Sequence, residues 1–199
     1  MALKFVGPVF DHLFTPPANP LHSHGDPDWY TPPPYVEAAR DVMGGIDLDP
    51  ASDPIANKII QATKYYTKAE NGLMQEWRGR VFLNPPGDKV NEFWRALMGG
   101  VVGYVTEFVW IGYSLEQLQT LQAIEDLPKP LNFAMCIPKK RMAFVENEAK
   151  RALRLQKCLK EGKTFREKTS PTHANYISYY GEHTGIFKAA FESFGQVRL

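Results

Sequence analysis

The sequence predicts an α/β fold in which helices cover a largely parallel sheet. From residue 35 onward, short apolar runs alternate with segments whose apolar residues recur at helical spacing. The run 101–110 is apolar almost throughout and rich in valine, as expected for a strand covered on both faces. A chain of 199 residues with 44% hydrophobic residues is long and apolar enough to bury the core of one domain.

The first half of the chain supplies two helices and a short strand in this scheme. Apolar residues at helical spacing predict a helix over 35–43, and Gly44-Gly45 ends it. A short strand is expected at 46–49. Ser52-Asp53-Pro54 then has the composition of a helix start, and the helix is expected to bury Ile55, Ile59 and Ile60.

The remaining elements continue the alternation. Residues 63–79 read as mostly loop, and 80–83 as a strand that Asn84-Pro85-Pro86-Gly87 stops. The predicted order is then, by residue range: helix 90–98, strand 101–110, helix 115–124, strand 131–137, helix 146–159, strand 175–180 and helix 185–194.

Proline usage separates an irregular N-terminal arm from the rest of the chain. Eight of the sixteen prolines precede Tyr35, so residues 1–25 are expected to form an arm and 26–199 a single domain. The arm holds His22 and His24 but no second cluster of ligands, and we predict no metal site.

Several classes of protein are disfavoured by composition. The chain has no apolar run of about 18 residues, and its N-terminus lacks the apolar stretch of a secretory signal, so neither a membrane span nor secretion is expected. Two cysteines, Cys136 and Cys158, are too few for a disulfide framework or a four-cysteine zinc site. We therefore expect a protein that works inside the cell.

Positive charge is concentrated in one segment. Residues 137–173 hold eleven basic and four acidic residues, a net charge of +7 in a chain whose total is +1. Such segregation indicates a polyanionic partner, although a solvated helix explains the charge alone equally well. Residues 138–173 are accordingly expected to form a basic helical insertion that contacts nucleic acid.

Polar residues follow two of the predicted strands, where ligands bind in open α/β sheets. The segment Asp47–Ser52 offers carboxylates that accept hydrogen bonds from a ribose or an amino group, beside free N–H groups at a helix start. Ordinary turn and capping chemistry explains this segment more simply, and the motif alone favours that interpretation. It also lacks the Gly-x-Gly of a dinucleotide-binding loop.

The second segment, Asn84-Pro85-Pro86-Gly87, presents acceptors on a rigid loop. Asparagine offers a side-chain carbonyl, while the prolines have fixed φ and no N–H. Acceptors held in this way fit an exocyclic NH₂ group that must become nucleophilic. Its position at the end of an apolar strand favours this interpretation over a plain turn.

The ordered set of motifs resembles the phage DNA N-6-adenine-methyltransferases of the Dam type. The resemblance extends from about residue 26 to residue 197. Its motifs are Asp28-Trp29-Tyr30-Thr31-Pro32, Asp47-Leu48-Asp49-Pro50-Ala51-Ser52, Asn71-Gly72-Leu73 with Trp77, Leu83-Asn84-Pro85-Pro86-Gly87, Cys136-Ile137-Pro138-Lys139-Lys140-Arg141 with Phe144-Val145, and Ser170-Pro171-Thr172-His173-Ala174-Asn175 with Tyr180-Gly181.

This resemblance implies a class I, Rossmann-like fold that uses S-adenosylmethionine and acts on double-stranded DNA. It also implies a protein encoded by a phage or prophage and working in the bacterial host cytoplasm. A monomer is compatible with the sequence, which does not determine the oligomeric state. The implied catalytic residues are Asn84, Pro85 and Pro86; the cofactor-binding residues Trp29, Thr31, Pro32, Asp47, Asp49, Pro50 and Ala51; and the nucleic-acid-binding residues Lys139, Lys140, Arg141, His173 and Asn175.

Two departures from the family pattern keep alternatives open. Gly87 stands where an aromatic residue usually follows the prolines, so stacking on a base would fall to Tyr30 or Phe144. Ser52-Asp53 replaces the glycine-rich part of the cofactor loop. The alternatives are a non-catalytic DNA-binding protein on the same scaffold, and an amino-methyltransferase acting on cytosine N4 or another amide or amino substrate.

Overall fold

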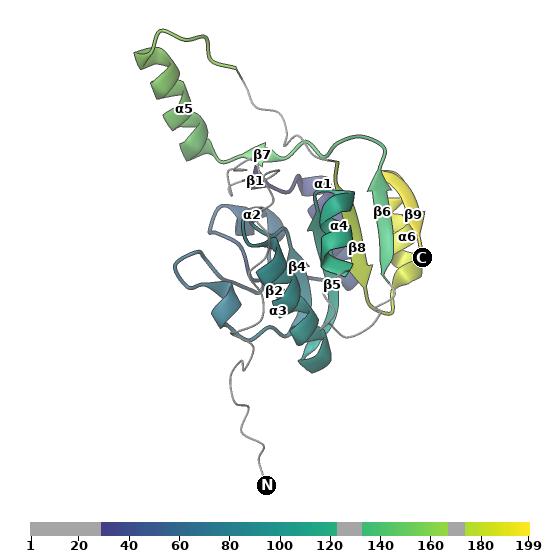
Figure 1. The fold of residues 1–199 in the computed structure, drawn as a ribbon. Coiled ribbons are helices and arrows are strands. Elements are labelled where there is room, and N and C mark those ends of the chain that lie inside the picture. Colours follow the sequence, from purple (N-terminus) through teal and green to yellow (C-terminus); the bar gives the residue numbers. More distant parts are fainter. Residues whose placement is uncertain (1–28, 123–132, 167–173) are drawn as a thin grey trace.

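The computed structural model describes residues 29–122, 133–166 and 174–199, and it confirms the α/β prediction (Figure 1). The arm expected at 1–25 and the site candidate His173 lie outside these ranges. In this part of the chain a seven-stranded sheet is flanked by helices on both faces. In their order across the sheet, the strands are β3 (Lys64–Tyr65), β2 (Leu48–Asp49), β4 (Gly79–Leu83), β5 (Val105–Gly112), β8 (Tyr176–Tyr180), β6 (Ala134–Pro138) and β9 (Gly195–Arg198).

The sheet is mixed rather than wholly parallel. Strands β3, β2, β4, β5 and β6 run in one direction, whereas β8 and β9 run in the opposite one. The four parallel neighbours β3, β2, β4 and β5 place their carboxyl ends along one edge of the sheet. The loops that follow β2, β4 and β5 therefore emerge together, which is the arrangement that the sequence predicts.

Helices cover the two faces of the sheet in separate layers. On one face lie α1 (Pro33–Met43), α2 (Ala56–Ile60) and α6 (Thr184–Phe191), and on the other lie α3 (Val90–Gly103) and α4 (Leu115–Gln122). Strand β5 confirms its predicted double burial, because Val109 and Ile111 pack on the first face and Phe108 and Trp110 on the second. The alternation follows from the two-residue repeat of a strand.

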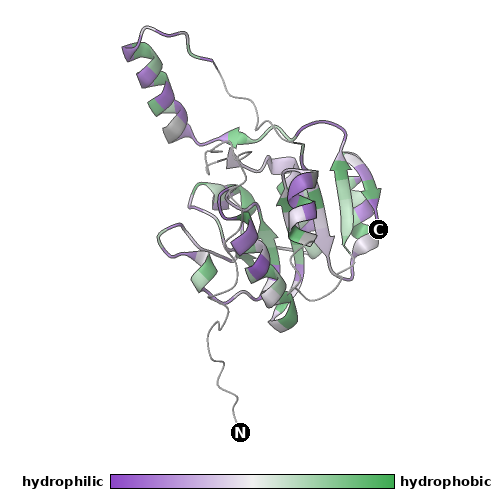
Figure 2. Cartoon of the chain, in the orientation of Figure 1, coloured by the Kyte–Doolittle hydropathy of each residue, from purple (hydrophilic) through white to green (hydrophobic). Residues whose placement is uncertain are grey.

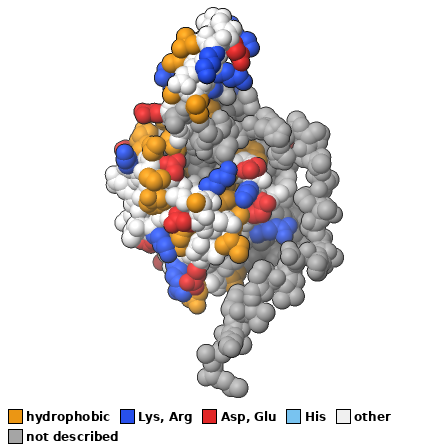
Figure 3. Space-filling view, turned by 90° about the vertical axis from the view of Figure 1, so that its left-hand side faces the viewer, with side chains coloured by type: hydrophobic (Ala, Val, Ile, Leu, Met, Phe, Trp, Pro, Cys, Tyr) orange, Lys and Arg blue, Asp and Glu red, His pale blue; other side chains and the backbone are white. Residues whose placement is uncertain are grey.

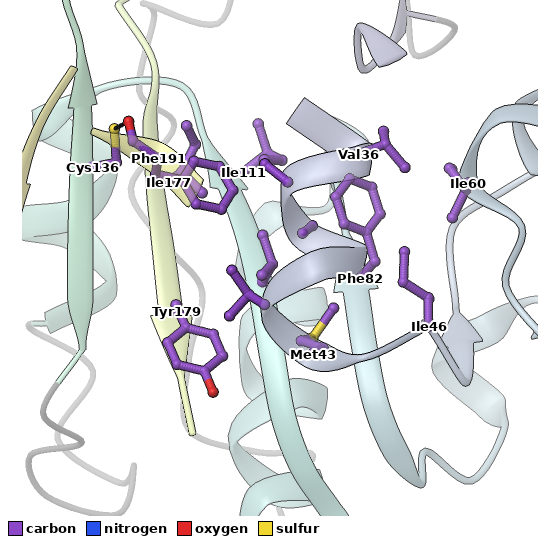
Figure 4. Packing of buried hydrophobic residues seen from close by; sticks show 14 of the residues in the cluster. Val36, Met43, Ile46, Ile60, Phe82, Ile111, Cys136, Ile177, Tyr179 and Phe191 are labelled. Carbon is purple, nitrogen blue, oxygen red and sulfur yellow. Dashed lines mark hydrogen bonds between the residues drawn. The ribbon is translucent and has the colours of Figure 1, made fainter. Parts of the chain in front are cut away.

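The first layer shows how α1 seals the sheet (Figure 4). Val36 and Met43 lie on the inner side of this helix, against Phe82 of β4 and Ile111 of β5. Gly44 ends the helix in the left-handed conformation, with φ of 69°, and its N–H bonds to the Arg40 carbonyl, so the predicted glycine cap is confirmed.

Several sequence-based boundaries were wrong, and two of the differences have clear physical reasons. Helix α3 extends to Gly103 and includes Val101 and Val102, so the strand predicted at 101–110 begins only at Val105. Val102 is 71% exposed, which would not occur in a strand covered on both faces. Ile55 is exposed rather than buried, because the Asp53 side chain accepts the N–H groups of Ile55 and Ala56 and the helix begins one residue later.

Four short strands were not predicted. They are β1 (Trp29–Tyr30), β3, β7 (Val145–Glu146) and β9. Three of them have only two residues, which is too short for any alternation to register in the sequence. Strands β1 and β7 pair antiparallel with each other, apart from the main sheet.

The predicted basic helix is present as α5 (Glu148–Lys160), in the segment between β6 and β8. It projects from the body of the molecule (Figure 1), and hydrophilic and hydrophobic residues alternate along it (Figure 2). None of its described side chains joins either core cluster.

Every helix in the described ranges is too short or too polar to span a lipid bilayer.

Substitution of Gly72 tests the packing beneath the β2–α2 loop. A Cβ atom at Gly72 would lie 2.0 Å from the Pro50 carbonyl oxygen, so Gly72→Ala is expected to lower the free energy of unfolding by about 2 kcal/mol or more. Urea denaturation measures the change. The matched control is Gly99→Ala on the exposed side of α3, where a Cβ meets nothing within 4 Å; it should raise stability by up to about 1 kcal/mol. Equal effects of the two substitutions would contradict the packing argument.

Candidate functional site

Three of the segments singled out in the sequence meet at the carboxyl edge of the sheet. The Asn84 Nδ2 group, just beyond β4, donates to the Trp29 carbonyl of β1 at 3.2 Å. The Tyr30 hydroxyl donates to Asp53 Oδ2 of the β2–α2 loop at 2.9 Å. Strand β1 thus connects the Asn84 loop with the loop that follows β2.

The hydrogen bond to Trp29 determines which way the Asn84 amide faces. A carbonyl only accepts, so Nδ2 must face Trp29 and Oδ1 must face the other way. Within the described ranges, neither Asn84 Oδ1 nor the Pro85 carbonyl receives a hydrogen bond, whereas the Pro86 carbonyl accepts from the Lys89 N–H at 3.0 Å. Two acceptors of the loop are therefore available for a ligand.

Asp49 ends β2 as a buried carboxyl group. The residue is 2% exposed, and its Oδ1 accepts the Ala51 N–H at 3.0 Å. Burial raises the pKa of Asp49 to about 7, and the Ala51 hydrogen bond only partly opposes this shift. A buried carboxyl group that accepts from the Ala51 N–H and the Ser52 side chain still has acceptor capacity for a ligand.

Asp47 has a different role from Asp49, although the sequence offered both as cofactor contacts. Its carboxylate accepts the Arg80 Nε and Nη2 groups at 2.8 and 2.6 Å, and also the Arg80 backbone N–H at 2.9 Å. The side-chain hydrogen bond from Arg80 lowers the pKa of Asp47. Asp47 therefore joins the segment at β2 to the start of β4 through its contacts with Arg80.

Two buried hydroxyl groups accompany Asp49 on these loops. Thr31 Oγ1, directly after β1, is buried without a hydrogen-bond partner in the described ranges, whereas Ser52 Oγ, in the β2–α2 loop, is buried beside Asp49 and helps to lower the pKa of that carboxyl group. Buried polar atoms without partners are uncommon in folded proteins, which makes the Thr31 hydroxyl a candidate ligand contact. Next to them in the chain, Pro32 caps α1 and is half-buried, Pro50 is buried, and Ala51 is half-buried.

The predicted nucleic-acid residues divide into exposed and buried groups. Lys139, Lys140 and Arg141 follow β6, and all three are exposed. Asn175 is 6% exposed, and its Nδ2 donates to the Gly112 carbonyl at 3.2 Å, so its side chain supports the end of β5. The basic α5 carries a concentration of Lys and Arg side chains at the top of Figure 3.

Tyr30 and Phe144 belong to the core rather than to an open stacking surface. Tyr30 is 9% exposed and Phe144 7%, and both pack in the cluster beneath α1. The Tyr30 hydroxyl also accepts from Asn147 Nδ2 at the base of α5. Sequence reasoning missed the links of Tyr30 to Asp53 and Asn147, because contacts over such separations leave no local pattern.

Comparisons with known protein families, with curated proteins and with solved structures find no match to this chain. Among the described residues, no group of three or more His, Cys, Asp or Glu side chains is arranged to hold a metal ion.

The raised pKa of Asp49 predicts a pH-dependent stability. The folded chain holds the Asp49 proton up to about pH 7, whereas an unfolded aspartate releases it near 3.8. Stability should therefore fall as pH rises through this window, by an amount on the order of a few kcal/mol. Asp49→Asn keeps an acceptor for the Ala51 N–H and removes the titration, so its advantage over wild type should grow from pH 4 to pH 7.

Urea denaturation at a series of pH values measures this difference. Asp47→Asn is the control, and its pH dependence of stability should have the opposite sign because Arg80 lowers the pKa of Asp47. Asp47 stabilises the fold above its unfolded pKa, and that contribution is lost as pH falls. Parallel pH profiles for wild type and Asp49→Asn would show that the Asp49 titration does not contribute.

Proposed function

We propose that this chain transfers a methyl group from S-adenosylmethionine to the exocyclic amino group of adenine in double-stranded DNA. The observation that carries the proposal is the orientation of the Asn84 amide, which leaves Oδ1 and the Pro85 carbonyl as acceptors at the carboxyl edge of the sheet. The mixed sheet with helices on both faces is compatible with the Rossmann-like class I fold that the motif order implies.

The paired acceptors suit an amino group that must act as a nucleophile. Asn84 Oδ1 and the Pro85 carbonyl accept the two N6 hydrogens of adenine, which increases the electron density on N6. When bound, S-adenosylmethionine supplies an electrophilic methyl group on sulfur. Because N6 gains a carbon and then releases one proton to solvent, the chain needs no strongly basic residue. Positioning and fixed dipoles provide the acceleration.

The loops around Asp49 fit the polar parts of this cofactor. Asp49 has acceptor capacity for a hydroxyl or ammonium group, and the Thr31 hydroxyl is buried without a partner among the described residues. Trp29, Pro32, Pro50 and Ala51 would contribute walls and backbone to the same pocket. Asp47 supports this pocket through Arg80 rather than by contact.

The basic insertion fits a polyanionic partner on the same side of the protein. Lys139, Lys140 and Arg141 lie at the carboxyl end of β6, and α5 is connected to the site through the β1–β7 pair. Phosphate contacts from these side chains would hold the duplex. The target base would then have to leave the helical stack to reach Asn84.

Gly87 favours one alternative, a DNA-binding protein that retains the fold without the reaction. A Cβ atom at Gly87 would meet nothing within 4 Å, so the space beside the Asn84 loop is open and carries no ring from this position. The acceptor geometry alone also fits cytosine N4. Product analysis separates these possibilities.

Removal of the Asn84 amide tests the reaction. Asn84→Ala is expected to reduce methyl transfer from labelled S-adenosylmethionine to unmethylated DNA by at least about a hundredfold, because an aimed acceptor is lost. Nucleoside analysis should find N6-methyladenine with wild type. The control is Asn91→Ala, the same change at an exposed position of α3, and it should retain full activity.

Cofactor binding and DNA binding decide how a negative result is interpreted. Asn84→Ala should still show the rise in melting temperature that S-adenosylmethionine gives wild type, by linkage to the native state. Wild-type protein that binds DNA but shows neither this rise nor transfer would support the non-catalytic alternative. If the product were N4-methylcytosine, the target base of the proposed reaction would be cytosine rather than adenine.

The exposed Lys140 side chain tests the position of the duplex. Lys140→Gln should weaken DNA binding at low salt and reduce the slope of log K against log salt by about 0.9, the value for one lost phosphate contact. Fluorescence anisotropy over a salt series measures both quantities. Lys188→Gln on α6, also exposed, is the matched control and should leave the slope unchanged. Identical slopes for all three proteins would place the DNA elsewhere.

A further inference from the structure

Two side-chain amides form hydrogen bonds with one peptide group at the end of β5. The Asn175 Nδ2 group donates to the Gly112 carbonyl at 3.2 Å, and the Tyr113 N–H donates to Gln117 Oε1 at 2.9 Å. The Gly112 carbonyl and the Tyr113 N–H belong to the same peptide. Both Asn175 and Gln117 are 6% exposed, so this pair of contacts is buried.

The orientation of the Gln117 amide is determined by its partner. An N–H group only donates, so Oε1 must face Tyr113 and Nε2 must face away from it. In the described part of the chain, Nε2 is buried and has no hydrogen-bond partner. A buried donor without an acceptor costs roughly 1–3 kcal/mol, so a ligand atom that accepts from Nε2 would be favoured.

The direction of the peptide places Gln117 on the side of the Asn84 loop. The carbonyl and N–H of a trans peptide point in opposite directions, and the described chain has no cis peptide bond. The Gly112 carbonyl faces Asn175, which precedes β8 on one side of β5. The Tyr113 N–H and Gln117 therefore lie toward β4, which is on the other side of β5.

The end of β4 lies level with this position. Leu83 of β4 pairs with Trp110 of β5 in parallel register, so Asn84, Pro85 and Pro86 leave the sheet beside residues 111–113. Gln117 stands in the first turn of α4, which begins directly beyond this point. The free acceptors of the Asn84 loop and the unpaired donor of Gln117 thus belong to the ends of two neighbouring strands, on the same side of β5.

We propose that Gln117 Nε2 is a specificity determinant that donates to the ring nitrogen adjacent to the amino group of the target base. This inference rests on the proposed function and assigns a base-reading contact to the same site. Adenine presents N1 as an acceptor beside its N6 amino group, and cytosine presents N3 beside N4. Guanine and thymine carry an N–H at the equivalent ring position, which would face the Gln117 donor and be rejected.

The residue has a structural role that a test must leave intact. The Gln117 N–H donates to Ser114 Oγ at 3.0 Å, and its side chain accepts from Tyr113, a reciprocal arrangement close to a helix capping box. Gln117→Glu keeps an oxygen for the Tyr113 N–H and replaces the Nε2 donor by an acceptor. Gln119→Glu makes the same change at an exposed position of the same helix and serves as the control.

The test pairs these variants with a change in the base. Duplexes with adenine or 1-deazaadenine, which has C–H in place of N1, are compared in equilibrium binding and in methyl transfer. Wild type and Gln119→Glu should prefer adenine by about ten- to a hundredfold, because the analogue leaves Nε2 unpaired. In Gln117→Glu the preference should disappear or reverse.

The outcomes separate this inference from the proposed function. An unchanged preference for adenine over 1-deazaadenine in folded Gln117→Glu would overturn the assignment to Gln117, whatever the level of transfer. A preference in binding that is lost in Gln117→Glu, without transfer in wild type, would retain the base contact and remove the methyltransferase reaction. No preference in wild type would overturn the contact with the ring nitrogen.

Discussion

The hydrogen bond from Asn84 Nδ2 to the Trp29 carbonyl is the contact on which the arrangement of the site depends. It joins the end of β4 to β1, two segments that are 55 residues apart in the chain. It also determines that the amide oxygen, not the nitrogen, remains for a ligand. Because the Trp29 carbonyl belongs to a strand paired with β7, the orientation of Asn84 depends on backbone pairing rather than on one flexible side chain.

The two aspartates of the β2 region show how position in a strand decides chemistry. Asp47 and Asp49 are two residues apart, yet one is held as a carboxylate by Arg80 and the other is buried with a raised pKa. Desolvation dominates at Asp49, whereas hydrogen bonding to a cation dominates at Asp47. The ion pair fixes β2 against β4, and this leaves Asp49 at the strand end with capacity for a ligand.

Local patterns in the sequence predicted much of this architecture. The apolar run in β5, the glycine cap of α1 and the Asn84 loop after a strand are visible within a few residues, and the structure confirms those elements. Short β1 and β7 and the antiparallel direction of β8 and β9 depend on pairing between distant segments. The sequence offered both Asp47 and Asp49 as ligand contacts, and only the ion pair of Asp47 with Arg80 distinguishes them. Arg80 is 33 residues away from Asp47, and no spacing rule indicates that partner.

The same distant contacts connect the projecting helix to the site. Asn147, at the base of α5, donates to the Tyr30 hydroxyl, which donates in turn to Asp53, the residue that caps α2. Tyr30 precedes Thr31 and follows Trp29, so one short strand contacts the insertion, the loop after β2 and the Asn84 amide. A partner that binds α5 would therefore act on backbone that also positions the acceptors of the site. This physical connection makes the basic insertion part of the site's construction.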